Sequence, residues 1–152
     1  MQLMRSSSTA QGTGPIYTLG TGNRTAADFF SILRRYAIDT LIDVRRHPQD
    51  DPSPHFNRDG LEASLTRAEI HYRWLGSLLG GVRFGGYGKH RRTVSYQKGL
   101  QMVERLARQG PTVLVCAEKM PWKCHRYDIA EDLVARGWRV VHLLDLNDSR
   151  PH

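Results

Sequence analysis

Residues 116–126 hold the densest group of side chains in the chain that could do chemistry. Both cysteines of the protein, Cys116 and Cys124, lie here together with Glu118, a histidine and several cations. A thiolate can attack an electrophile, a carboxylate can move a proton, and cations can hold an anionic ligand. We therefore predict a functional site in this segment, with Cys116, Glu118 and Cys124 as the catalytic candidates.

The segments on either side place this group at the end of a strand. Residues 111–115 form an apolar run that predicts a buried strand, and residues 127–137 have the pattern of an amphipathic helix ending at a glycine. In an open α/β sheet, ligands bind at the turns that follow the carboxyl ends of the strands. The thiols are therefore expected to face such a crevice.

Cys124 is the thiol that the sequence favours as a thiolate. It stands at the predicted start of a helix, where the backbone N–H groups and the helix dipole stabilise negative charge. Nearby cations should lower its pKa further: Lys119, Lys123, His125 and Arg126. For Cys116 the alternative of a small buried hydrophobic residue stays open.

A metal site is the less favoured interpretation of the same residues. Cys116, Cys124 and His125 could supply three ligands, with His47 or His55 as a fourth. Structural zinc sites, however, use cysteines paired two to four residues apart, and seven residues separate these two. We therefore predict no cofactor.

Other polar residues follow other predicted strands. Asp43 lies near the end of a buried strand, where a charge needs a partner such as Arg45 or Arg126. Such a pair is either purely structural or turns a guanidinium toward an anionic ligand. The candidates for ligand binding are Asn23, Arg24, Asp43, Arg45, His55, Lys119, His125 and Arg126.

Two glycine-rich segments are weaker indications. Residues 20–24 form a glycine turn that could cradle an anion, but they lack the third glycine and the lysine of the nucleotide-binding fingerprints. Residues 76–93 are predicted to form a long loop with six glycines, cations and aromatic side chains. Such a loop suits stacking on nucleic-acid bases or a mobile lid, and a solvated basic loop is the alternative.

The elements that must position these residues alternate along the chain. We predict strands at residues 16–19, 40–44, 70–75, 111–115 and 138–143, and helices at 25–36, 58–68, 95–108 and 127–137. Thr25 and Asn57 are the expected N-caps of the first two helices. This order predicts an α/β fold: one three-layer domain with a mostly parallel five-stranded sheet and helices on both faces. We place a disordered lead-in at residues 1–14, the domain at 15–144 and a polar tail at 145–152.

Composition limits the partners and the compartment. The 152 residues carry a formal charge of +7, which favours an anionic small molecule or nucleic acid as partner, although a merely basic enzyme would look the same. No run of 18 apolar residues predicts a membrane span. The polar N-terminus lacks an export signal, so we expect a cytoplasmic protein with reduced thiols. The sequence does not specify an oligomeric state.

Three functional hypotheses follow. The leading one is an enzyme that acts on an anionic, nucleotide or nucleic-acid-like ligand through a Cys/Glu/Arg pocket at the carboxyl ends of the strands. The alternative is a nucleic-acid-binding module without catalysis, supported by the net charge and the basic loop. A rhodanese-like or phosphatase-like cysteine enzyme ranks third. Such enzymes wrap a short loop around an anion, whereas nine residues separate Cys116 from Arg126 here.

With these segments in view, the chain resembles the family known as domain of unknown function 488, from Ile16 to about Leu143. The most specific match is C-x-E-K at residues 116–119 with C-H-R at residues 124–126. Weaker matches lie at residues 18–24, 43–45, 54–57, 75–81 and 86–87. Thr21 and Gly22 replace a His-Ser pair that is usual in the family. The resemblance implies an α/β fold and a shared polar site, and it implies no particular reaction.

Overall fold

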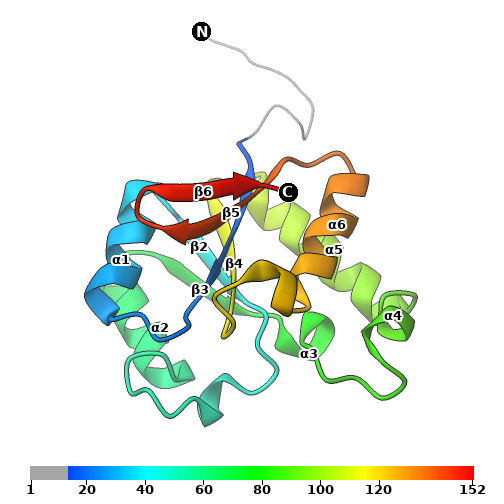
Figure 1. The fold of residues 1–152 in the computed structure, drawn as a ribbon, viewed down its shortest axis with the longest axis horizontal. Coiled ribbons are helices and arrows are strands. Elements are labelled where there is room, and N and C mark those ends of the chain that lie inside the picture. The colour runs from blue at the N-terminus through cyan, green and yellow to red at the C-terminus, as the bar shows by residue number, and fades with distance from the viewer. Residues whose placement is uncertain (1–13) are drawn as a thin grey trace, which may run out of the picture.

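The computed structural model describes residues 14–152. The predicted lead-in, residues 1–14, lies outside the described part of the chain except for Gly14. The described residues form one six-stranded sheet flanked by helices (Figure 1).

The strands are β1 (Ile16–Gly20), β2 (Thr40–Asp43), β3 (His71–Trp74), β4 (Thr112–Cys116), β5 (Val140–Asp145) and β6 (Asp148–Pro151). Their order in the sheet is β3-β2-β4-β1-β5-β6, and all neighbours are parallel except β5 and β6. The helices are α1 (Ala26–Arg35), α2 (Arg58–Arg67), α3 (Gly76–Leu79), α4 (Tyr87–His90), α5 (Val94–Ala107) and α6 (Arg126–Ala135). The turns η2 (Pro48–Asp50) and η3 (Pro121–Lys123) are 3-10 helices. The predicted α/β class with a mostly parallel sheet is confirmed.

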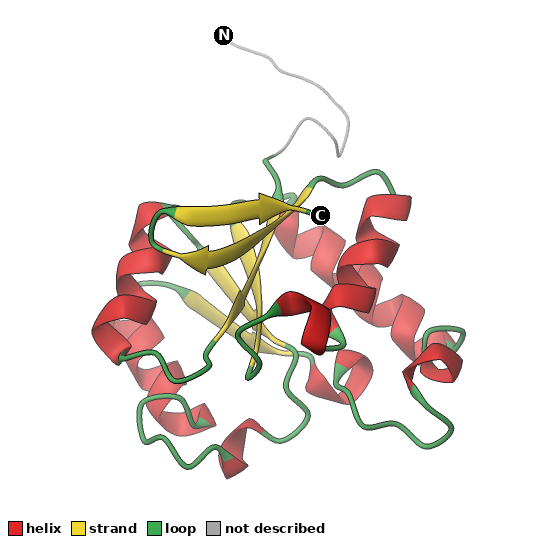
Figure 2. Ribbon diagram, in the orientation of Figure 1, coloured by secondary structure: helices red, strands yellow, loops and turns green. Residues whose placement is uncertain are grey.

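Helices cover both faces of the sheet (Figure 2). Helices α1 and α2 pack on one face and contribute Phe29 and Leu61 to one apolar core, while α5 and α6 contribute Leu100 and Ile129 to the other. Because side chains alternate along a strand, the four strands β1, β2, β4 and β5 divide their residues between the two cores.

Strand β4 shows how this alternation positions the site. Val113 and Val115 pack in the α1–α2 core, and Leu114 and Cys116 pack in the α5–α6 core. Cys116 therefore points to the face of the sheet from which α6 and its preceding turn arrive.

The predicted helix N-caps are confirmed. The Thr25 hydroxyl accepts a hydrogen bond from the N–H of Asp28 at 3.1 Å. The Asn57 side chain accepts one from the N–H of Gly60 at 2.9 Å. Each side chain satisfies a backbone donor that has no partner inside its own helix.

Two predictions about irregular segments are wrong. The polar tail at residues 145–152 was placed outside the domain, yet Asp148–Pro151 form β6 and pair antiparallel with β5. All four of its residues are exposed, so this edge strand shows no apolar alternation in the sequence. The predicted loop at residues 76–93 contains the helices α3 and α4, each of only four residues, which is too short for a helical period to be visible.

The glycine turn after β1 holds the segment that carries Cys116. The N–H of Thr21 donates to the carbonyl of Cys116, and the N–H of Gly22 donates to the carbonyl of Ala117, both at 2.8 Å. Both donors are thus engaged inside the protein, which leaves them no role as an anion cradle. At Gly20 a Cβ atom would overlap the carbonyl of Glu118, so only glycine allows this approach.

In the part of the chain described here, no helix combines the length and the apolar character that crossing a membrane requires.

We predict that Gly20→Ala destabilises the protein by about 2 kcal/mol or more, because backbone on both sides must move to admit the methyl group. Gly88→Ala is the matched control, since nothing lies within 4 Å of a Cβ at that position in α4. Urea denaturation of both variants measures the free energy of unfolding. Equal stabilities would show that the turn does not hold the Cys116 segment in the way described.

Candidate functional site

A pocket of about 380 Å³ opens at the carboxyl ends of β2 and β4. We call it the thiol pocket, because both cysteines line it. Other lining residues come from the segment after β2, from the loop between α3 and α5, and from the turn before α6: Arg45, Arg46, Gly81, Val82, Tyr87, Glu118, Lys123 and His125. Three distant segments of the chain therefore meet at one edge of the sheet.

The two cysteines lie in direct contact. The Sγ atom of Cys124 donates a hydrogen bond to Sγ of Cys116 over 2.7 Å. Cys116 is 1% exposed, whereas Cys124 is partly exposed. A sulfur that accepts a hydrogen bond in this way is favoured as the anion, so the two residues titrate as a pair, which shares one proton once it is ionised.

Arg126 supplies the positive charge beside this pair. Its side chain is completely buried, and its Nε donates to Cys116 Sγ at 3.0 Å. Its Nη1 donates to the Thr18 hydroxyl at 2.6 Å, and its Nη2 donates to the carbonyls of Glu118 and Lys119 at 2.7 and 2.9 Å.

No carboxylate forms an ion pair with Arg126 among residues 14–152. A buried guanidinium is unfavourable unless it is hydrogen-bonded and its charge is balanced. Of the groups that accept hydrogen bonds from the Arg126 guanidinium, the Cys116 sulfur is the one that can become an anion. The arrangement therefore favours a thiolate at Cys116.

The pKa values of the two thiols move in opposite directions. Burial opposes ionisation of Cys116, but the hydrogen bond from Cys124 and the charge of Arg126 outweigh it and lower the pKa of Cys116 to about 7. The hydrogen bond to Cys116, together with burial, raises the pKa of Cys124 far above its usual value.

This reverses the expectation that Cys124 is the thiolate. Cys124 does stand beside the start of α6, where it accepts a hydrogen bond from the backbone N–H of Arg126 at 3.4 Å. The guanidinium of Arg126, however, turns back beneath the end of β4 and reaches Cys116 instead. A charged hydrogen bond outweighs a long neutral one.

His125 places a proton acceptor next to Cys124. Its Nε2 lies 3.1 Å from the carbonyl oxygen of Val44, which can only accept, so Nε2 carries the proton. In the neutral ring Nδ1 is then unprotonated, and it lies 3.5 Å from Cys124 Sγ. Burial lowers the pKa of His125, so the ring is neutral at pH 7.

Glu118 lies at the rim of the thiol pocket. Its side chain is exposed, and one carboxylate oxygen accepts a hydrogen bond from the N–H of Met120 at 3.4 Å. Its backbone carbonyl, rather than its carboxylate, contacts Arg126. The carboxylate can thus meet a ligand in the pocket but does not contact the sulfurs.

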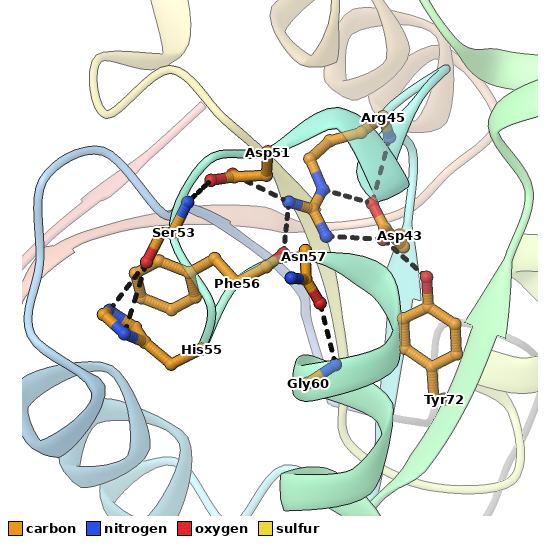
Figure 3. A network of polar contacts seen from close by, with 9 residues as sticks. All are labelled: Asp43, Arg45, Asp51, Ser53, His55, Phe56, Asn57, Gly60 and Tyr72. Atoms are coloured by element: carbon orange, nitrogen blue, oxygen red, sulfur yellow. Dashed lines mark hydrogen bonds and ion pairs between the residues drawn. The ribbon is translucent and has the colours of Figure 1, made fainter.

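Asp43 and Arg45 belong to a separate network (Figure 3). Arg45 Nε and Nη2 donate to the two carboxylate oxygens of Asp43 at 2.9 and 2.8 Å, and the Tyr72 hydroxyl donates to Asp43 at 2.6 Å. Arg45 Nη1 also reaches Asp51 at 3.1 Å and the carbonyl of Phe56 at 2.7 Å. The guanidinium is therefore neutralised by two carboxylates, which is the structural pairing left open above.

The alternation of side chains explains why Asp43 does not join the cysteines. Leu41 packs in the α1–α2 core, and Ile42 and Val44 pack in the α5–α6 core. Asp43 therefore faces α1 and α2, on the opposite side of the sheet from Cys116. Arg45 alone touches both regions, because it lines the thiol pocket as well.

The remaining candidates lie outside the thiol pocket. His55 is hydrogen-bonded to Ser53 at 3.1 Å and packs against Phe56 on the far side of the Arg45 network (Figure 3). Arg24 donates to the carbonyls of Gly20 and Leu144, both at 2.7 Å, and so ties β1 to β5. Asn23 and Lys119 are likewise absent from the lining.

Some of the site's residues carried no clear signal in the sequence. Thr18 accepts from Arg126, and its hydroxyl lies 2.6 Å from Nδ1 of the buried His142. Burial lowers the pKa of His142 to about 4, so it adds no charge near Arg126 at pH 7. The sequence does place a polar residue at a buried position of each strand, Thr18 in β1 and His142 in β5, and this could have drawn attention to them. Arg46 and Tyr87 line the pocket from segments predicted only as loop.

The described residues contain no group of three or more His, Cys, Asp or Glu side chains placed to hold a metal ion. His125 turns Nε2 to a carbonyl, and His47 and His55 lie outside the thiol pocket. The four-ligand set considered from the sequence is therefore not brought together.

Comparison with known proteins agrees with the resemblance noted from the motifs. A family model described as "Domain of unknown function DUF488" matches residues 25–133. Neither the curated proteins nor the solved structures yielded a match.

We predict that one thiol of the native protein titrates with an apparent pKa of about 7, while the other stays protonated over the accessible range. The pair then carries a negative charge above pH 7 and loses it below. Thiolate absorbance in the ultraviolet, followed against pH, measures this.

Two single variants serve as controls. Cys124→Ala removes the hydrogen bond that helps to lower the pKa of Cys116, so that pKa should rise. Cys116→Ala removes the competing thiolate, so the pKa of Cys124 should fall toward its ordinary range. Two thiols that titrate together in the ordinary cysteine range would contradict the arrangement.

Proposed function

The chain belongs to the DUF488 family, and from the geometry of its thiol pocket we propose that it is an enzyme acting on an anionic, phosphate-bearing ligand. The ligand is a nucleotide or a nucleic-acid-like molecule, and a cysteine is the nucleophile. The observation that carries the proposal is the completely buried guanidinium of Arg126, which has no carboxylate partner among residues 14–152 and donates to the sulfur of Cys116. A thiolate held in this way at a pocket is typical of catalytic cysteines.

The two thiols take different roles. Cys124 is the more exposed sulfur and attacks the electrophilic atom of the ligand, forming a bond from Sγ as the leaving group departs. Its proton passes to Cys116 across the existing 2.7 Å hydrogen bond. A base works best when its pKa lies near the working pH, and the value of about 7 for Cys116 meets that condition.

Neighbouring groups support the same step. Nδ1 of His125 is a second proton acceptor for Cys124. Glu118 is assigned to exchange a proton with the leaving group, because this residue lines the pocket and its exposed carboxylate does not contact the sulfurs. Arg126 is a positioning residue in this scheme, since it has no exposed surface with which to meet a ligand.

The charge around the pocket supports an anionic ligand. Arg46 and Lys123 line the thiol pocket, and Arg46 also lines a neighbouring pocket of about 390 Å³. We call this neighbour the Arg58 pocket; its lining is Arg46, His47, Gln49, Arg58, Trp74 and Ser77, with no carboxylate. The Arg58 guanidinium lies 4.8 Å above the Trp74 ring. A ligand with its reactive group at the thiols can therefore place a further phosphate near Arg46 and Arg58.

A nucleic-acid-binding module without catalysis is the second candidate. It is favoured by Phe84 and Val82, which are 98% and 94% exposed in the basic loop beside the thiol pocket. An exposed aromatic side chain among cations is suited to stacking on a base.

A phosphatase-like or rhodanese-like enzyme is less well supported, because the donors of Arg126 are directed inward and not toward an anion in the pocket.

We predict that purified protein turns over at least one member of a panel of nucleoside phosphates and short oligonucleotides, with products identified by chromatography. Cys124→Ser should reduce that turnover by at least about a hundredfold, because a hydroxyl is a much poorer nucleophile here. Glu118→Gln should reduce it less, and the matched control Glu62→Gln, at an exposed position of α2, should not change it. Full activity in both Cys116→Ser and Cys124→Ser would exclude the proposed chemistry.

We predict that Arg58→Gln and Arg46→Gln each weaken binding of a fluorescently labelled nucleotide about tenfold, because each removes a charged contact to phosphate. Arg67→Gln, at the exposed end of α2, is the control and should bind normally. Fluorescence anisotropy measures the affinities. Unchanged binding in both pocket variants would remove the Arg58 pocket from the proposal.

The binding-module candidate makes a different prediction for a labelled single-stranded oligonucleotide. Phe84→Ala should weaken its binding, and the Cys116→Ser/Cys124→Ser double variant should bind as tightly as the native protein. Affinity should also fall steeply with salt. A flat salt response would eliminate this candidate, while turnover that depends on the cysteines would favour the enzyme.

A further inference from the structure

We propose that Cys116 and Cys124 form a redox-active dithiol, which a peroxide closes to an intramolecular disulfide and a small thiol reopens. The site is the pair of sulfurs at the end of β4, and the reactant class is a hydroperoxide such as hydrogen peroxide. The proposal goes beyond the function proposed above and does not depend on it, because it needs no other substrate.

The geometry already brings the sulfurs together. They lie 2.7 Å apart although eight positions separate them in the chain. The turn η3 folds the intervening segment back, with the N–H of Cys124 bonded to the carbonyl of Pro121 at 3.2 Å. Both residues line the thiol pocket, so a molecule as small as a peroxide can meet them there. The chain contains no third cysteine that could compete.

The oxidation balances as two steps. The Cys116 thiolate attacks one peroxide oxygen, the O–O bond breaks, and the departing hydroxide takes a proton from solvent and leaves as water. Cys116 is then a sulfenic acid. The Cys124 sulfur attacks this sulfur, the S–S bond forms as the S–OH bond breaks, and the proton of Cys124 leaves with the hydroxide as a second water. Two electrons have passed from the cysteines to the peroxide. In the reverse direction, one small thiolate attacks a sulfur of the disulfide and forms a mixed disulfide as the S–S bond breaks, and a second thiolate attacks the sulfur of the small thiol and releases the disulfide of the two small thiols, with both cysteines reduced.

Arg126 makes the reduced form the favoured one. In the reduced state the Cys116 thiolate balances the completely buried guanidinium of Arg126. In the disulfide state that anion is gone. Arg126 then keeps its bonds to Thr18 and to two carbonyls but has no ion-pair partner among residues 14–152. Disulfides whose reduced form is stabilised as a thiolate are readily reduced, unlike structural disulfides. The Cys116–Cys124 bond therefore belongs to the labile class.

The groups that face the sulfurs leave Cys116 as the one that changes charge near neutral pH. Burial lowers the pKa of His125 and raises that of Tyr87, so both are neutral near pH 7. The other charged groups lining the pocket are Arg45, Arg46, Glu118 and Lys123. The number of protons taken up when the disulfide is reduced should therefore fall by one at the pH where Cys116 ionises.

Intact-protein mass spectrometry tests disulfide formation. Reduced protein is treated with one equivalent of hydrogen peroxide, and free thiols are then capped with N-ethylmaleimide under denaturing conditions. We expect a monomer two hydrogen atoms lighter that takes up no label, and that takes up two labels after treatment with reduced glutathione. Cys116→Ser and Cys124→Ser should give no such species. Native protein that still takes up two labels, or that gains oxygen atoms without forming the disulfide, would overturn the proposal.

A redox titration at several pH values tests the role of Arg126 on the native protein. At a fixed ambient potential, the ratio of reduced to oxidised protein should fall about a hundredfold per pH unit below the pKa of Cys116 and about tenfold above it, because one proton fewer is bound. Arg126→Gln should move this break to higher pH. A uniform slope in the native protein, or a disulfide that excess reduced glutathione cannot open, would contradict the assignment. Neither experiment involves the nucleotide panel, so either proposal can fail alone.

Discussion

The contact between the buried guanidinium of Arg126 and the sulfur of Cys116 is the interaction on which the site depends. A cation without solvent requires an anion or a complete set of acceptors. Arg126 has the acceptors, in Thr18 and two backbone carbonyls, and only Cys116 can supply the anion. The charge state of the thiol pair is therefore linked to the packing of α6 against the sheet, and the pKa of Cys116 falls to about 7 although burial opposes this.

Two polar networks lie at the same edge of the sheet but on opposite faces. One joins Asp43, Arg45 and Tyr72, and its charges are balanced within the protein. The other joins Cys116, Cys124 and Arg126 and becomes balanced when a thiol ionises. The first network gives a fixed framework that holds the chain after β2, whereas the second can change its charge. This difference is why the proposed chemistry and the proposed redox step both lie at the sulfurs.

Close backbone approach makes this arrangement possible. Gly20 allows the carbonyl of Glu118 to pack against β1, and that carbonyl is one of the acceptors for Arg126. The glycine turn after β1 is therefore part of the support of the thiolate. Arg46 and Lys123 line the same pocket and give it the positive charge that the proposed anionic ligand requires. On the two proposals, the same pair of thiols would serve a nucleophilic reaction when reduced and lose that capacity when oxidised.

The sequence by itself determined the alternation of strands and helices, the caps at Thr25 and Asn57, and the location of the thiols after a buried strand. These properties depend on periodicity and on local hydrogen bonds, which a short stretch of chain reveals. It also located Cys116, Glu118, Cys124, His125 and Arg45, all of which line the thiol pocket.

The tertiary structure alone decided that Asp43 faces away, that Arg126 supports Cys116 and not a ligand, and that the thiolate is Cys116 rather than Cys124. It alone revealed β6, whose exposed residues follow no apolar pattern. The physical reason is that these outcomes depend on contacts between distant segments, on which side chains reach one another across the sheet, and on burial, none of which residue spacing encodes.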